Sequence, residues 1–78
     1  MPHINVKLYP GRTEEQKAEL ARRIVEDVVA AAGVGEDAVS VAIEEVTTED
    51  WADAVYRKDI EPHLERPDRL YKKPGYRM

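Results

Sequence analysis

A chain of 78 residues is enough for one domain with a small core, and a domain of this size is only marginally stable alone. It contains no cysteine, which excludes a disulfide framework and a thiolate metal site. A net charge of −4 argues against nucleic acid as the main partner, and no apolar run is long enough for a membrane span or a signal peptide, so we expect a cytoplasmic protein.

The first predicted element is a strand over residues 3–9, in which apolar and polar side chains alternate. Ile4, Val6 and Leu8 share one face, with the period of two that is typical of a half-buried strand. The pair Pro10-Gly11 ends the strand, because neither residue continues a β ladder readily.

A long helix is predicted to begin after Thr13 and to end at Gly33. Thr13 and Gln16 have the spacing of a capping box, and glycine is the usual residue just past a helix end. Apolar residues recur at helical spacing along one stripe, while charged residues, including the pair Glu19 and Arg23, occupy the opposite face. We interpret the charged face as solvated surface.

Residues 39–46 alternate again and predict a second strand. A strand, a helix and a second strand indicate a right-handed βαβ unit with parallel strands. Two strands under one helix are not a stable domain, and the second face of the sheet is too mixed in polarity to form a core. We therefore expect an α+β fold whose sheet is completed by another copy of the chain.

The remainder of the chain predicts a short helix from about Glu49 to Ile60, capped by Thr48. Residues 61–78 are rich in proline and predict an extended tail. Within that tail, Tyr71 and Tyr76 are the predicted apolar anchors. We treat residues 1–78 as a single domain that ends in this tail.

Pro2 is the candidate catalytic residue, because it directly follows Met1. Removal of Met1 would turn the Pro2 nitrogen from an amide into a secondary amine. An unperturbed α-amino group titrates near about 7.7–8.0, and burial or a neighbouring cation lowers that pKa towards the range of a general base at neutral pH. The alternative interpretation is that Met-Pro is simply a common way for a protein to begin.

The order of these features resembles the tautomerase superfamily, and within it the 4-oxalocrotonate tautomerase family. The resemblance covers residues 2–51 and rests on Pro2, the following strand, and the run Pro10-Gly11-Arg12-Thr13-Glu14-Glu15-Gln16-Lys17. Trp51 and the ending Tyr71-Lys72-Lys73-Pro74-Gly75-Tyr76 are similar to the longer bacterial branch of PptA-like tautomerases. The resemblance implies a βαβ, half-ferredoxin-like subunit.

The resemblance also implies a cofactor-free isomerase that moves a proton in keto–enol or dienol–enone conversion of 2-oxo carboxylates. Pro2 matches the acid–base residue of that family, Arg12 matches its substrate-binding arginine, and Trp51 falls where the family has an aromatic wall. Ser40 stands where the prototype has a second arginine. A serine hydroxyl supplies no charge, so the substitution favours a phenylpyruvate-like monocarboxylate over a dicarboxylate.

Each candidate also has a purely structural interpretation. Arg12 could be a surface loop residue, and Trp51 could fill a core or an interface. The competing function is a non-catalytic oligomeric βαβ module for association or small-ligand binding, which the fold alone does not separate from an enzyme. We expect a homodimer, with a hexamer built as a trimer of dimers as the alternative. We expect no metal, no cofactor, and no nucleic-acid or membrane partner.

Overall fold

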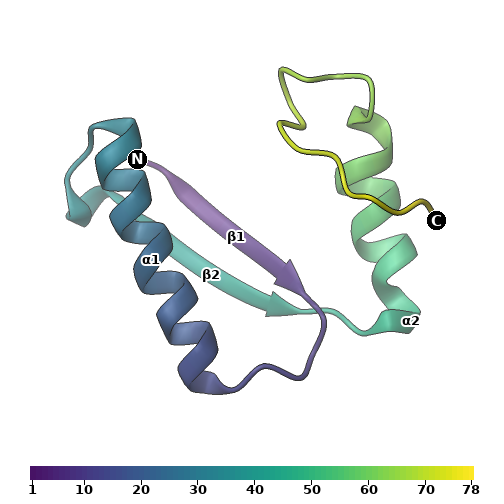
Figure 1. Cartoon of the computed structure of the whole chain (residues 1–78), viewed down its shortest axis with the longest axis horizontal. Helices are drawn as coiled ribbons and strands as arrows, with labels where there is room; N and C mark the ends of the chain where they lie inside the picture. Colours follow the sequence, from purple (N-terminus) through teal and green to yellow (C-terminus); the bar gives the residue numbers. More distant parts are fainter. The chain divides into compact units, whose positions relative to one another are not determined.

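The computed structural model describes residues 1–78 as two compact units, Met1–Glu45 and Val46–Met78, and each is described by itself. The first unit begins with strand β1 (His3–Leu8), which helix α1 (Glu14–Ala32) follows (Figure 1). A short turn, η1 (Glu36–Ala38), then leads into strand β2 (Ser40–Glu45).

The two strands pair in parallel, from His3 opposite Ser40 to Leu8 opposite Glu45, and α1 runs along them. This arrangement confirms the predicted βαβ unit. The predicted strands over residues 3–9 and 39–46 are each present with slightly shorter bounds.

Helix α1 begins and ends where its sequence signals predict. The Thr13 hydroxyl accepts a hydrogen bond from the Gln16 backbone N–H at 3.0 Å, and the Gln16 side chain accepts one from the Thr13 N–H at 2.9 Å. These two bonds satisfy N–H groups that a helix start otherwise leaves without partners. At the other end Gly33 adopts a left-handed conformation with φ of 70° and donates to the Val29 carbonyl.

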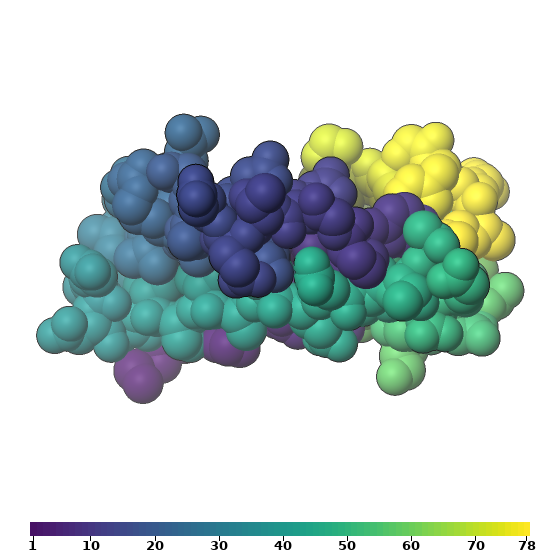
Figure 2. Space-filling model, turned by 90° about the horizontal axis from the view of Figure 1, so that it is seen from below, coloured from purple at the N-terminus to yellow at the C-terminus, as the bar shows by residue number.

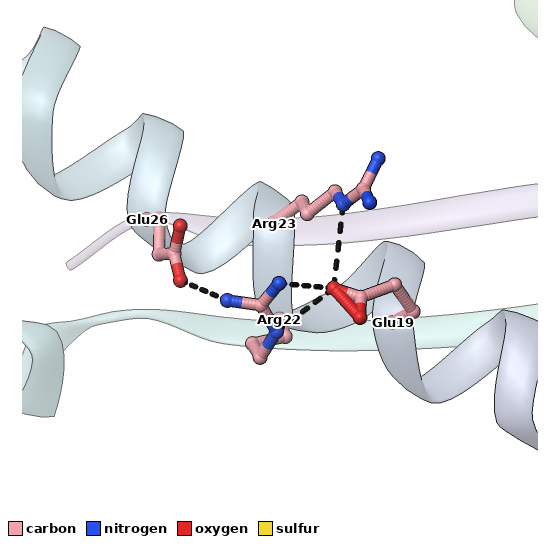
Figure 3. A network of polar contacts seen from close by, with 4 residues as sticks. All are labelled: Glu19, Arg22, Arg23 and Glu26. Carbon is pink, nitrogen blue, oxygen red and sulfur yellow. Dashed lines mark hydrogen bonds and ion pairs between the residues drawn. The ribbon is translucent and has the colours of Figure 1, made fainter.

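The outer face of α1 carries a network of ion pairs (Figure 3). The Glu19 carboxylate accepts from Arg22 Nε at 2.9 Å and from Arg23 Nε at 3.3 Å, and Arg22 also pairs with Glu26. The hydrogen bond from Arg22 lowers the pKa of Glu19, and the same bond raises the pKa of Arg22. Arg22, Arg23 and Glu26 are exposed, which confirms the predicted solvated face and its Glu19–Arg23 pair.

The first unit has an incomplete core. The apolar residues between α1 and the sheet are half-buried, and the chain's buried hydrophobic side chains, Val46, Val55 and Tyr56, all belong to the second unit. The other face of the sheet is largely exposed, for example at His3 and Ser40. A two-stranded sheet with one bare face needs further packing for stability.

The second unit opens with helix α2 (Thr48–Trp51), which continues directly into the π-helical segment η2 (Ala52–Ile60) and the single turn η3 (Glu61–His63). The predicted helix is therefore present, but its cap is Thr47, not Thr48. Thr47 has extended backbone angles and its hydroxyl accepts from the Asp50 N–H at 3.3 Å, whereas Thr48 is already helical. The bond from the Glu61 N–H to the Tyr56 carbonyl has the five-residue spacing of a π-helix.

The tail after η3 contains no further helix or strand and runs back along the helix of its own unit (Figure 1). Turn hydrogen bonds shape its first part, from the Arg66 N–H to the His63 carbonyl and from the Leu70 N–H to the Arg66 carbonyl. Tyr76 anchors the tail, as predicted, through its ring contact with Tyr56. The same prediction is wrong for Tyr71 within one chain, because Tyr71 is 88% exposed.

No helix in the structure combines the length and the apolar character that crossing a membrane requires.

Candidate functional site

Pro2 lies immediately before β1 and is half-buried. Its carbonyl oxygen accepts a hydrogen bond from the Ser40 N–H at 3.2 Å, which fixes Pro2 at the amino end of the sheet. Met1 is fully exposed, and Figure 2 shows the purple N-terminal end of the chain projecting from the surface. Removal of Met1 would therefore leave the Pro2 nitrogen at a fixed position without disturbing packed side chains.

Ser40 begins β2 directly opposite His3, and both residues are exposed on the sheet face that α1 does not cover. The Ser40 hydroxyl lies 2.7 Å from Nδ1 of His3, a hydrogen-bonding distance. The fold thus brings two predicted site residues, Pro2 and Ser40, together at the amino ends of the parallel strands. The partnership of His3 with Ser40 was not predicted, because strand register fixes it and sequence spacing does not.

Arg12 lies in the loop between β1 and α1 and is exposed. The preceding Gly11 has φ of 125°, a conformation that glycine adopts without strain and that turns the chain out of the strand. Beyond the loop, Lys17 pairs with Glu14 at 2.7 Å and with Glu45 at 3.5 Å, which ties the start of α1 to the end of β2. The bond to Glu14 is the main reason that the pKa of Lys17 is raised.

Pro2 and Arg12 lie at opposite ends of β1 (Figure 1). The strand has six residues at about 3.3 Å each, so the two site residues of one chain are about 20 Å apart. Arg12 therefore does not lie beside the Pro2 nitrogen of the same chain. Although the two residues are close in the sequence, the extended strand between them holds them apart in space.

Trp51 is the last residue of α2 in the second unit and is half-exposed. Its indole N–H donates a hydrogen bond to the Tyr76 hydroxyl oxygen at 2.9 Å. The Tyr76 ring in turn packs against Tyr56, with ring centroids 5.8 Å apart and planes tilted by 40°. This aromatic cluster connects residues 25 positions apart in the sequence, and the residue spacing gave no signal for it beyond the presence of the aromatic residues.

Side chains that could bind a metal ion do not cluster in this chain. No group of three or more His, Cys, Asp or Glu side chains gathers at one place. His63 has a buried Nδ1 without a hydrogen-bond partner, but it has no such group around it. The chemistry available is that of a nitrogen at Pro2, a hydroxyl at Ser40, a guanidinium at Arg12 and an indole at Trp51.

Comparison with known proteins gives concordant results. The family described as Tautomerase enzyme matches residues 2–58. A probable tautomerase of Xylella fastidiosa (strain 9a5c) is 46% identical over 76 residues, covering 97% of this chain and 89% of the relative. Tautomerase PptA of Enterobacter sp. (strain 638) is 40% identical over 79 residues, covering both chains completely.

Among solved structures, YwhB, a homologue of 4-oxalocrotonate tautomerase, aligns with a TM-score of 0.64 and 37% identity, covering 69% of this chain and 88% of its own. The strand–helix–strand geometry, the match over residues 2–58 and the full-length relatives agree with one another. The chain therefore belongs to the tautomerase family and is an isomerase of that class.

Proposed function

We propose that this tautomerase acts on 2-oxo carboxylates and their enols, with the Pro2 amine as general acid and base after Met1 has been removed. The observation that carries the proposal is the position of Pro2, which is half-buried and hydrogen-bonded to the start of β2 behind a fully exposed Met1. The lone pair of a nitrogen held in this way keeps one direction, because the proline ring also fixes the backbone dihedral angle φ. A fixed direction is what a general base needs.

The proposed reaction needs no cofactor. The neutral amine takes a proton from the carbon next to the carbonyl, and the C–H electron pair becomes the carbon–carbon double bond of an enolate. Negative charge develops on the carbonyl oxygen, where donors that are already in place lower the barrier. The protonated amine then returns the proton to another atom of the conjugated system, which completes the isomerisation and regenerates the base.

Arg12 and Ser40 are the proposed substrate-binding donors. A guanidinium binds a carboxylate through two parallel hydrogen bonds, whereas the Ser40 hydroxyl can donate to a carbonyl oxygen but adds no charge. One strong anion-binding group favours a monocarboxylate. Trp51 supplies a ring face for an aromatic or apolar substituent, so a phenylpyruvate-like substrate fits this set of groups best.

The distance between Pro2 and Arg12 requires a second chain if both act on one substrate. Because about 20 Å separates them along β1, the arginine at a given Pro2 must come from a neighbouring copy. The bare face of the sheet and the incomplete core of the first unit support such an assembly. A homodimer is the favoured form, and a trimer of dimers is the alternative.

The test compares processed protein, in which mass spectrometry confirms an N-terminal Pro2, with a variant that carries one extra residue before Pro2. Both are assayed for ketonisation of enol-phenylpyruvate. We expect activity in the processed protein and loss of nearly all activity in the extended variant, with unchanged circular dichroism and unchanged sedimentation. Pro2→Ala keeps a primary amine at the same place and should retain partial activity.

Equal rates for the processed and extended proteins would remove the amine from the mechanism. Activity in neither would favour the alternative, a non-catalytic module for association or small-ligand binding.

A further inference from the structure

Trp51 is held by the C-terminal tail. Its indole N–H donates to the Tyr76 hydroxyl at 2.9 Å, and the Tyr76 ring rests against Tyr56, which is only 2% exposed. Tyr76 itself remains 43% exposed, so part of this residue faces the solvent. The tail tyrosine thus joins a buried aromatic residue, Tyr56, to a half-exposed one, Trp51.

The π-helical geometry of η2 makes this contact feasible. Trp51 and Tyr56 are five residues apart, a spacing that would place them about 140° apart around an ordinary α-helix. In a π-helix the hydrogen bonds join residues five apart, so such residues lie on the same side. Both side chains can then meet Tyr76, Trp51 through its N–H and Tyr56 through its ring.

The hydrogen bond also decides which part of Trp51 is available to a ligand. An indole has a single donor, the Nε1–H, and here Tyr76 accepts it. With this donor occupied, the indole ring offers a ligand apolar and stacking contacts. A half-exposed indole without a fixed partner would exchange between rotamers, whereas the bond to Tyr76 favours one of them.

We propose that Tyr76 is a positioning residue that fixes the Trp51 indole and thereby sets the preference of the site for an apolar or aromatic substituent. This inference rests on the proposed function, in which Trp51 contacts the substrate. Tyr76 acts through Trp51 and takes no part in the proton transfer. Through Tyr76, the C-terminal tail therefore contributes to the substrate preference of the site.

The test uses Tyr76→Phe, which keeps the ring that packs on Tyr56 but removes the oxygen that accepts from Trp51. Tyr71→Phe is the matched control, because it makes the same chemical change in the same tail at a side chain that is 88% exposed. Trp51 is the only tryptophan of the chain, so tryptophan fluorescence reports on this indole alone.

In Tyr76→Phe we expect a shifted emission maximum and a lower steady-state anisotropy of Trp51. The KM for enol-phenylpyruvate should rise about two- to tenfold, the range of one lost neutral hydrogen bond, with a smaller change in kcat. The KM for the enol of pyruvate, which has no aromatic substituent, should change less. Tyr71→Phe should resemble the wild type in all these measurements, and circular dichroism should show that both variants are folded.

Unchanged Trp51 emission and anisotropy in Tyr76→Phe would overturn the proposal, because the hydrogen bond would then have no influence on the indole. Changed fluorescence with equal KM changes for the two enols, or with none, would also overturn it, because Tyr76 would not select the substituent. Failure of the proposed function is recognised separately, as inactivity of the processed wild type, and it would overturn the inference even where the fluorescence result is positive.

Discussion

At the scale of single residues, the candidate site divides into groups that one chain brings together and groups that it keeps apart. Pro2 and Ser40 meet at the amino ends of the strands, whereas Arg12 lies at the other end of β1. The sequence proposed all three as site residues by their type and order. It could not place them, because their distances depend on strand direction and register, which are properties of the folded pair.

Replacing Arg12 separates a role in binding from a role in folding. Arg12 is exposed, so Arg12→Ala should leave the melting temperature nearly unchanged. A lost charge-assisted hydrogen bond to a carboxylate is worth about 1.5–3 kcal/mol, so kcat/KM for enol-phenylpyruvate should fall by about ten- to a hundredfold. Arg23→Ala, on the outer face of α1, is the control and should keep its activity. Unchanged kinetics in Arg12→Ala would show that Arg12 does not bind the substrate.

Ser40 offers a test of substrate charge. Ser40→Arg adds a guanidinium beside Pro2, so the ratio of kcat/KM for the dicarboxylate 2-hydroxymuconate to that for enol-phenylpyruvate should rise about tenfold or more. Ser40→Ala is the control, because it removes the hydroxyl that bonds His3 without adding charge, and it should not raise the ratio. A ratio that is the same in all three proteins would place residue 40 outside the substrate site.

At the scale of the elements, the sequence predicted the helices from local signals and missed what packing decides. The capping box and Gly33 define α1 because each acts within a few residues. The prediction placed the cap of α2 at Thr48, one residue too late, because the adjacent Thr47 is of the same type and only the backbone angles distinguish the two. The hydrogen bonds of η2 join residues five apart, and the sequence pattern of this segment did not distinguish them from those of an α-helix.

The ion pairs of α1 predict a direction for acid destabilisation. Arg22 lowers the pKa of Glu19 in the folded chain, so the pair stabilises the fold above the unfolded value of about 4.5, and that contribution is lost as the pH falls through the lower folded value. Glu19→Gln should therefore lose less thermal stability than the wild type between pH 7 and pH 3 at low salt. The effect is small, because these groups are exposed and screened.

Asp27→Asn is the control for that measurement, since it changes an exposed carboxylate of the same helix. Its melting temperature, followed by circular dichroism at 222 nm, should depend on pH as the wild type does. A pH dependence in Glu19→Gln equal to that of the wild type would show that the network in Figure 3 does not contribute to stability in solution.

At the scale of the whole molecule, composition already indicated that one chain is incomplete, and the structure gives the reason. The chain has few buried side chains, and its first unit exposes one face of a two-stranded sheet. We expect a homodimer by sedimentation at micromolar concentration, with the tail packed across the neighbouring subunit. A stable, folded monomer under those conditions would contradict this prediction.

Mixing two impaired variants tests whether the site is shared between subunits. One variant carries an extra residue before Pro2, and the other carries Arg12→Ala. If Pro2 of one subunit works with Arg12 of its partner, each mixed dimer contains one complete site and one site that lacks both groups. After refolding an equal mixture, half of the dimers should be mixed, so activity should return to about a quarter of the wild-type value in a two-fold symmetric dimer.

The control is each variant refolded alone at the same total concentration. The extended variant should stay inactive, and Arg12→Ala should keep no more than about a tenth of the wild-type activity. Differently tagged chains confirm by co-purification that mixed dimers have formed. If they form and no activity returns, Pro2 and Arg12 do not complement each other across the interface. Because about 20 Å of β1 separates the two residues in one chain, that result would also remove Arg12 from the substrate site. Recovery would instead show that assembly is a requirement of the chemistry and not only of stability.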